Sequence, residues 1–344
     1  MKFPTIPLSL ALLTPSSTVP LAGLIAGVQA RATVAQNLRT HRVTRLMQCL
    51  KHFCIGGNAN KAKSVLRAAI LFLSAVPFSC STLAFGQDGY FSNWFNRVDK
   101  TQSEQPHWMT PVATTTPRLE EEFRYDQDWL QHVDGYTWNE YDGAKGLELI
   151  PWYKTELIIQ TPPYYNYGGD PSETNGSGDI AFLVKYRILS RNEQHGNYIL
   201  TAFLGWSIPT GTYSNGQVTG ANSATITPTV AYGKGYGNLD VQGTFGVQNP
   251  TTNELVNGRN YLWNNTLQYR VVKKLWPEIE FNTTHYQDGE HAGKALNYIT
   301  PGIVAGRFML TKRVGMSIGG GFQIATTQFY RNNHNGIFTI RFPF

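Results

Sequence analysis

The chain has few cysteines, and all of them lie near its start. The three are Cys49, Cys54 and Cys80, so residues 87–344 contain none. This distribution excludes disulfides, thiolate catalysis and cysteine-ligated metals from the larger part of the chain. It also suits export through an oxidising compartment, where a free thiol is a liability.

Acidic residues are missing from the first 86 positions. That stretch carries nine basic residues and no Asp or Glu, which leaves 20 basic against 23 acidic residues (net −3) in the remainder of a chain whose total is +6. A basic leader before a near-neutral body predicts a targeting segment and argues against nucleic-acid binding.

Residues 61–86 have the pattern of a signal peptide. Lys61, Lys63 and Arg67 precede the apolar run Ala68–Phe78, and small residues before Gln87 predict cleavage there. Export through the periplasm is therefore expected. An over-long gene start, with initiation near Met47 or later, explains the first sixty residues as well as a functional extension does.

Residues 87–344 contain no run of 18 apolar residues, which argues against a helical membrane protein. They contain instead segments of about ten to fifteen residues in which apolar and polar side chains alternate. In one of these, Phe182, Val184 and Tyr186 share one face, and Lys185 and Arg187 share the other. Such alternation predicts strands with two different environments.

We expect about twelve strands in an antiparallel transmembrane β-barrel, with a range of 10–14. They are placed near residues 118–128, 137–149, 153–163, 178–190, 197–209, 223–234, 237–248, 258–272, 275–287, 297–312, 313–328 and 334–344. Long connections at 164–177, 210–222, 249–257 and 288–296 alternate with short ones at 235–236 and 273–274. Long outer loops and tight periplasmic turns are typical of outer-membrane barrels.

The last strand carries Phe338, Ile340, Phe342 and Phe344 on one face. Such a strand suits the closing strand of an outer-membrane barrel, and with it recognition by the barrel-assembly machinery. A soluble β-sandwich binding module would show the same alternation with its apolar face inward. Residues 87–117 are polar, carry three prolines and show no period. We expect them to form a periplasmic segment with a short helix near Phe91–Val98.

Four stretches of the chain carry a family resemblance. They are residues 117–126 (PRLEEEFRYD), 178–187 (GDIAFLVKYR), 202–211 (AFLGWSIPTG) and 340–344 (IRFPF). Together they resemble the outer-membrane barrel transporters named for the MetA (meta-cleavage) pathway of phenol degradation, over roughly residues 117–344. The resemblance implies a barrel of about twelve strands in the bacterial outer membrane. It further implies passage of small solutes, aromatic or hydrophobic ones among them, without a catalytic motif.

The candidate site residues are charged side chains expected to face the barrel lumen. They are Lys185, Arg187, Arg270, Glu278 and Glu280. They either set solute selectivity or pair with one another across the lumen, and pairing is the more common outcome. His285, Asp288, Glu290 and His291 are metal-ligand types, but on an outer loop such groups usually contact solvent. We therefore expect no metal and no cofactor.

The leading hypothesis is a channel or transporter that is not an enzyme, with a lumen that is narrow or partly plugged. The runner-up is an outer-membrane barrel lipid hydrolase. That activity requires a Ser–His pair on the outer surface. Thr283 and His285 share a face of one expected strand, but no serine partner is evident.

Overall fold

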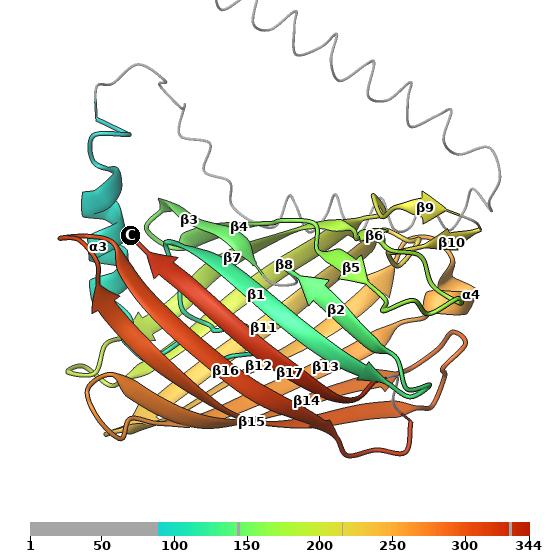
Figure 1. The fold of residues 1–344 in the computed structure, drawn as a ribbon. Coiled ribbons are helices and arrows are strands. Elements are labelled where there is room, and N and C mark those ends of the chain that lie inside the picture. Colours follow the sequence, from blue (N-terminus) through green and yellow to red (C-terminus); the bar gives the residue numbers. More distant parts are fainter. Residues whose placement is uncertain (1–88, 143–144, 215, 330–331) are drawn as a thin grey trace, which may run out of the picture. The chain divides into compact units, whose positions relative to one another are not determined.

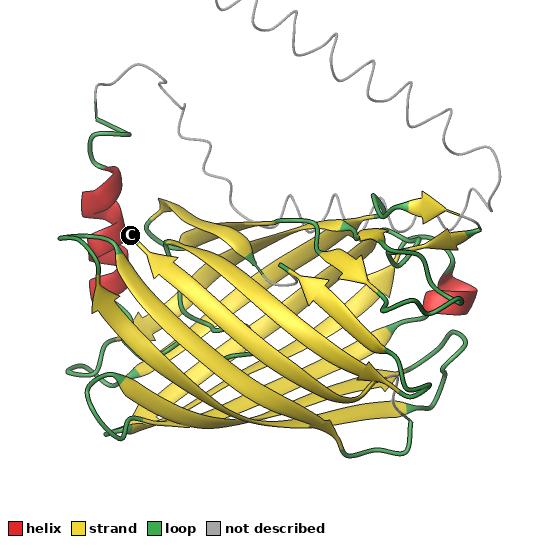
Figure 2. Ribbon diagram, in the orientation of Figure 1, coloured by secondary structure: helices red, strands yellow, loops and turns green. Residues whose placement is uncertain are grey.

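The computed structural model describes residues 89–142, 145–214, 216–329 and 332–344. The expected leader, residues 1–86, lies outside these described residues. The described part consists mostly of strands, with the helix α3 (Trp94–Ser103) and the short helix α4 (Glu254–Asn257) (Figure 2). No helix in the described part is long and apolar enough to span a membrane.

The strands form a closed antiparallel barrel (Figure 1). They are β1 (Glu122–His132), β2 (Thr137–Tyr141), β3 (Gly146–Trp152), β4 (Thr155–Gln160), β7 (Ile180–Arg191), β8 (Tyr198–Ile208), β11 (Thr225–Tyr236), β12 (Leu239–Pro250), β13 (Asn260–Tyr269), β14 (Leu275–Tyr286), β15 (Ala295–Met309), β16 (Gly315–Ala325) and β17 (Asn332–Pro343). The last strand, β17, pairs with β1 along its whole length and closes the sheet. Because β2 and β3 both pair with β1, they count as one barrel strand. The prediction of twelve strands is confirmed.

The second and third barrel strands are interrupted, which the sequence did not predict. Between β2 and β3 the backbone takes positive φ at Asp142 (60°) and Gly146 (67°). A Cβ on Gly146 would lie 2.6 Å from the carbonyl oxygen of Ile159, so only glycine fits this break. In the third strand, Pro162 and Pro163 separate β4 from the short β5 (Tyr164–Asn166). Proline has no N–H to donate to the ladder, so pairing stops there.

The barrel has its apolar face outside and its polar face inside. Outward Tyr186, Phe245 and Trp263 are 50%, 48% and 53% exposed, whereas inward Lys185 and Gln242 are buried. In β17 the outward Phe338, Ile340 and Phe342 are partly exposed, and the inward Thr339 and Arg341 between them are buried. A soluble sandwich requires the reverse, so that alternative is wrong. An apolar belt around a closed sheet is the architecture of an outer-membrane barrel.

The two ends of the barrel differ. Short turns at 192–197, 237–238, 270–274 and 310–314 lie at one end, which we call the short-turn end. The other, long-loop end has connections at 209–224, which hold the β9 (Tyr213–Ser214) and β10 (Gln217–Val218) hairpin, and at 251–259, which hold α4. Helix α3 and the C-terminus lie at the short-turn end (Figure 1).

Helix α3 begins three residues later than expected and packs on the short-turn end. Its Val98 is fully buried with Leu119 and Ile150, and Trp94 covers this cluster. The Thr101 hydroxyl donates to the carbonyl oxygen of Tyr153 at 3.0 Å. These contacts fix the point at which the chain enters the barrel.

Candidate functional site: a chain segment inside the barrel

Residues 105–118, which we call the inner segment, follow α3 into the barrel. Gln105, Met109, Val112, Thr114 and Thr116 are all buried. The hydrogen-bond partners of the segment belong to inward positions of β7, β8, β12, β14 and β17. The sequence predicted a periplasmic segment at residues 87–117, and in the structure the chain from Gln105 onward lies inside the barrel. The physical reason is that a polar lumen offers partners to a polar segment.

The inner segment has no regular secondary structure, so its backbone groups need partners outside the segment. Two glutamates of β14 accept three consecutive N–H groups. Val112 N donates to Glu278 Oε1 at 2.8 Å, and Ala113 N donates to Glu280 Oε1 at 2.7 Å. Thr114 N donates to Glu280 Oε2 at 2.6 Å. These two side chains therefore satisfy three backbone N–H groups that the segment itself leaves without partners.

Two arginines, three and four strands from β14 along the wall, bind the carbonyl groups of the same stretch. Arg341 of β17 donates to the carbonyl oxygens of Thr110 and Pro111, the latter at 2.6 Å. Arg124 of β1 donates to the carbonyl oxygen of Val112 at 2.5 Å. The N–H groups thus face carboxylates and the carbonyl groups face guanidinium groups. The charges of the wall match the polarity of the peptide groups that they contact.

Further contacts hold both ends of the inner segment. The Gln242 side chain donates to the carbonyl oxygen of Met109 at 2.9 Å and accepts from Thr116 Oγ1 at 2.8 Å. Thr201 Oγ1 donates to the carbonyl oxygen of Pro117 at 2.6 Å. Along the chain, the contacts of the segment therefore pass from β12 to β17 and β14 and return through β12 to β8.

Apolar side chains anchor the segment at two places. Met109 and Val112 pack against inward Trp276 and Val304 in a small buried cluster. Trp108 packs against β11, where a Cβ on Gly233 would lie 2.5 Å from the indole ring. Gly233 therefore makes room for Trp108.

Lys185, a predicted site residue, lies where the inner segment contacts the barrel wall, and its side chain is fully buried. Its Nζ is 2.9 Å from Glu156 Oε1 and 3.9 Å from Glu148 Oε2. It also donates to the carbonyl oxygen of Arg118 at 3.1 Å. Lys185 thus pairs with wall carboxylates and binds the inner segment at the same time.

Arg187, a second predicted residue, holds α3. Its guanidinium group donates to the carbonyl oxygen of Thr101 at 2.6 Å and pairs with Glu104 at 2.9 Å. Glu278 and Glu280, the third and fourth, are the acceptors described above. All four lie on the inward face, as expected, but their partners include the inner segment, which was not expected. Their role in solute selectivity stays a prediction.

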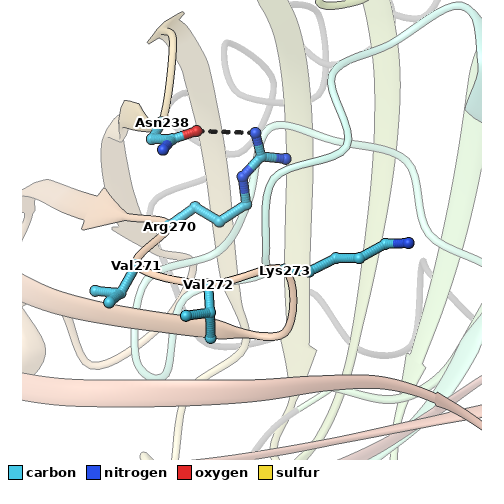
Figure 3. A pocket seen from close by; sticks show the side chains of 5 residues that line it. All are labelled: Asn238, Arg270, Val271, Val272 and Lys273. Carbon is cyan, nitrogen blue, oxygen red and sulfur yellow. Dashed lines mark hydrogen bonds between the residues drawn. The ribbon is translucent and has the colours of Figure 1, made fainter.

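Arg270, the fifth predicted residue, does not line the barrel interior. It follows the end of β13, is exposed, and donates to Asn238 Oδ1 at 2.9 Å (Figure 3). The strand ends one residue before Arg270, so the alternation of inward and outward side chains does not extend to Arg270. It lines a surface pocket with Val271, Val272 and Lys273.

A carboxylate in a turn at the short-turn end holds the start of the inner segment. Glu193 accepts from the backbone N–H of His107 at 2.5 Å and contacts its Nδ1 at 2.9 Å. Partial burial favours a raised pKa for Glu193, but the hydrogen bonds from the side chain and backbone of His107 outweigh it and lower the pKa to about 2.

The wall near the long-loop end has a different chemistry. Its inward side chains are mainly amides and hydroxyls that bond to one another across strands. Asn335 Nδ2 donates to Gln323 Oε1 at 2.6 Å, and Asn260 Nδ2 donates to Gln248 Oε1 at 3.0 Å. Asp128 and Glu140 lie opposite each other on β1 and β2. This half is polar without the inner segment.

The candidate metal residues near His285 do not converge. His285 stacks on Tyr261, with ring centroids 6.4 Å apart, whereas His291 packs against Tyr286 and Phe329. Asp288 accepts from the backbone N–H of Arg259. Among the described residues, no three His, Cys, Asp or Glu side chains form a metal-binding group.

Sequence reasoning missed Arg341, Arg124, Glu148 and Glu156 as site residues. Each is a charged residue on the inward face of a strand and is buried. The alternation could have identified them as inward charges. It could not have identified their partners, which lie far away in the sequence.

Comparison with known proteins shows the family. The chain matches the family model described as "Putative MetA-pathway of phenol degradation" over residues 130–342, and it belongs to that family. The resemblance predicted from the sequence is thereby confirmed. No curated protein matches the chain.

Several solved structures are similar to this chain. An outer membrane channel from Pseudomonas putida F1 shares 16% identity with a TM-score of 0.45, covering 64% of this chain and 93% of that one. The NanC porin shares 10% with a TM-score of 0.41, covering 65% and 98%. An anion-selective porin from Comamonas acidovorans shares 11% with a TM-score of 0.28, covering 65% and 97%.

Proposed function

We propose that this protein is a channel of the bacterial outer membrane for small solutes, aromatic ones included, whose passage is controlled by the inner segment. The observation that carries the proposal is a closed barrel with an apolar exterior and a polar lumen that contains a hydrogen-bonded length of its own chain. The short-turn end then faces the periplasm. The closing strand that ends at Phe344 is the segment for recognition by the barrel-assembly machinery.

The chemistry of the contact suits a segment that moves. A hydrogen bond to a charged group contributes about 1.5–3 kcal/mol when water does not compete. If the segment left, water could enter the polar lumen and solvate Glu280 and Arg341, so the net cost of displacement is much smaller than the sum of these bonds. Burial of Met109 and Val112, about 1.5–3 kcal/mol for each side chain, then favours the occupied state.

The family description favours aromatic solutes. It names phenol degradation, and phenol is a small aromatic molecule. Amide and hydroxyl groups near the long-loop end can hydrogen-bond a phenolic hydroxyl without binding it as tightly as a charge would.

The hydrolase alternative has little support. Thr283 and His285 lie on the outward face of β14, and His285 stacks on Tyr261. Neither the stack nor the cross-strand neighbours of His285 supply a serine nucleophile. We propose that the protein is not an enzyme.

Reconstitution tests the proposed function. The folded protein and a Glu280→Ala variant are compared by single-channel conductance and by swelling of liposomes in sugars of increasing size. We expect a small conductance for the unmodified protein and a conductance several times larger for the variant. An absence of conductance and swelling in both proteins would contradict the proposal.

A further inference from the structure

Four cations lie along one part of the rim at the short-turn end, near the end of β11 and in the turn between β13 and β14. They are Lys234, Arg270, Lys273 and Lys274. Elsewhere at this end, Arg187 pairs with Glu104 and Arg313 pairs with Asp99. Among the described residues, none of these four cations has a carboxylate within 4.0 Å. This part of the rim therefore carries an uncompensated positive charge.

Aromatic rings hold two of these cations at the outer surface. Lys234 Nζ lies 5.5 Å from the ring centroid of Tyr236 and 5.8 Å from that of Tyr198. Lys274 Nζ lies 4.8 Å from the ring centroid of Phe308. Lysines beside aromatic rings are typical of the headgroup level of a membrane, where the rings contact apolar chains and the ammonium group stays in the polar layer.

The other two cations line the surface pocket between the 237–238 and 270–274 turns, which has a volume of about 380 Å³. Arg270 and Lys273 extend to one side of their turn, and Val271 and Val272 point away from them (Figure 3). The two valines are 54% and 57% exposed. They follow the outward Tyr269 of β13 and so continue the lipid-facing surface.

We propose that this cationic rim binds the headgroup of an anionic phospholipid in the membrane leaflet at the short-turn end. Arg270, Lys273 and Lys274 contact the phosphate, and Val271 and Val272 contact the acyl chains. A membrane lipid fits better than a soluble anion because the apolar part of the patch is continuous with the outer surface of the barrel. The proposal depends on the barrel lying in a membrane and not on solute passage.

Lipid retention tests the proposal. The detergent-solubilised barrel is titrated with phosphatidylglycerol or phosphatidylcholine, and bound lipid is measured by native mass spectrometry. A cation beside an anionic lipid surface contributes roughly fivefold in binding. The triple variant Arg270→Gln, Lys273→Gln, Lys274→Gln should therefore bind phosphatidylglycerol at least about tenfold more weakly, with phosphatidylcholine binding unchanged.

A matched triple variant serves as the control. Lys154→Gln, Arg191→Gln, Lys312→Gln removes one arginine and two lysines that are exposed at the same end but outside this part of the rim. It should retain phosphatidylglycerol within about twofold, since screening limits the reach of an exposed charge to roughly 8–10 Å. Equal losses in the two triple variants, or no loss in either, would overturn the proposal.

A third arm distinguishes a lipid from a soluble anion. Val271→Ser with Val272→Ser should weaken phosphatidylglycerol binding and leave binding of inorganic phosphate unchanged. If phosphate displaces the lipid at low millimolar concentration and the serine variant binds lipid normally, the patch is a site for soluble anions and the lipid assignment is wrong.

Discussion

The inward polar side chains find their hydrogen-bond partners differently in the two halves of the lumen. Near the long-loop end, inward amides and hydroxyls such as Gln323 and Asn335 bond to one another along the wall. Near the short-turn end, inward charges such as Glu280 and Arg341 bond to the backbone of the inner segment. In the first half these bonds stay within the wall, whereas in the second they extend to a segment of chain inside the barrel. The comparison teaches that the charged half of the wall is built to hold a segment of chain.

The largest contrast should come from a polar-to-apolar change of similar size in each half. Lys185→Met leaves Glu148 and Glu156 buried without their cation, which we expect to cost about 3–5 kcal/mol of unfolding free energy. Gln323→Met removes neutral hydrogen bonds beside a lumen that water can enter, so its cost should stay below about 1.5 kcal/mol. Urea unfolding in lipid vesicles measures both. Similar costs would contradict the distinction between the halves.

Adding Glu156→Gln to Lys185→Met sharpens this result. The double variant leaves only one buried carboxylate, Glu148, without Lys185. Part of the lost unfolding free energy should therefore return. If the double variant is less stable than Lys185→Met alone, then Lys185 acts mainly through its bond to the carbonyl oxygen of Arg118.

Removing one carboxylate charge in each half should give the next largest effect. Glu280 accepts two backbone N–H groups of the inner segment, whereas Glu140 accepts only a long 3.3 Å hydrogen bond from Tyr165 among the contacts of the described residues. Glu280→Gln should weaken the hold on the segment by about 1.5–3 kcal/mol and raise its cleavage by an added protease at least about tenfold.

Glu140→Gln is the matched control for that experiment. It lies on the inward face of β2 in the long-loop half, and it should leave cleavage of the segment unchanged. Equal cleavage in the two variants would show that the carboxylate of Glu280 does not hold the segment.

Two inward glycines permit a comparison in which the expected loss of stability is smaller and comes from packing alone. A Cβ on Gly233 would lie 2.5 Å from Trp108, whereas a Cβ on Gly205 has its nearest neighbour, Leu183, at 3.4 Å. Gly233→Ala should therefore destabilise the protein by about 1–3 kcal/mol through overpacking, and Gly205→Ala should be neutral within about 0.5 kcal/mol. Tryptophan fluorescence reports whether Trp108 has moved. An unchanged spectrum and stability in Gly233→Ala would contradict this packing.

The smallest expected effect concerns pH. The pKa of Glu193 is lowered to about 2, so its contribution is complete above the unfolded pKa near 4.5 and disappears as the pH falls toward 2. Because Glu193 is substantially exposed, the effect should stay below about 1 kcal/mol. Cleavage of the inner segment by pepsin between pH 4.5 and 2 should rise in the unmodified protein and be flatter in Glu193→Gln. Parallel profiles would show that the contact between Glu193 and His107 does not hold the inner segment.

Much of the barrel could be predicted because alternation is a local property. The inward positions of Lys185 and Glu280 and the outward positions of Phe338 and Phe342 follow from parity alone. The break at Pro162 and Pro163 was present in the sequence, but the expected strand was drawn across it. The strand containing Gly146 was also drawn as continuous, because a positive φ at one glycine has no periodic signal.

The inner segment could not be predicted in the same way. Its sequence is aperiodic and contains Pro106, Pro111 and Pro117, which is also typical of a solvent-exposed linker. What places it in the barrel is a set of contacts with residues up to 231 positions away, such as that between Thr110 and Arg341. Contacts over such a sequence separation depend on the closed barrel and cannot be read from the local alternation of apolar and polar residues.

A reversible cross-link between the segment and the wall tests the central claim most directly. Thr114 Oγ1 lies 3.1 Å from Asn282 Nδ2, and residues 87–344 lack cysteine, so Thr114→Cys with Asn282→Cys introduces a single new pair. Conductance is recorded in planar bilayers before and after oxidation, with Cys49, Cys54 and Cys80 replaced by serine. We predict that oxidation abolishes solute conductance and that a reductant restores it. Identical conductance in the oxidised and reduced protein would show that the inner segment does not control passage.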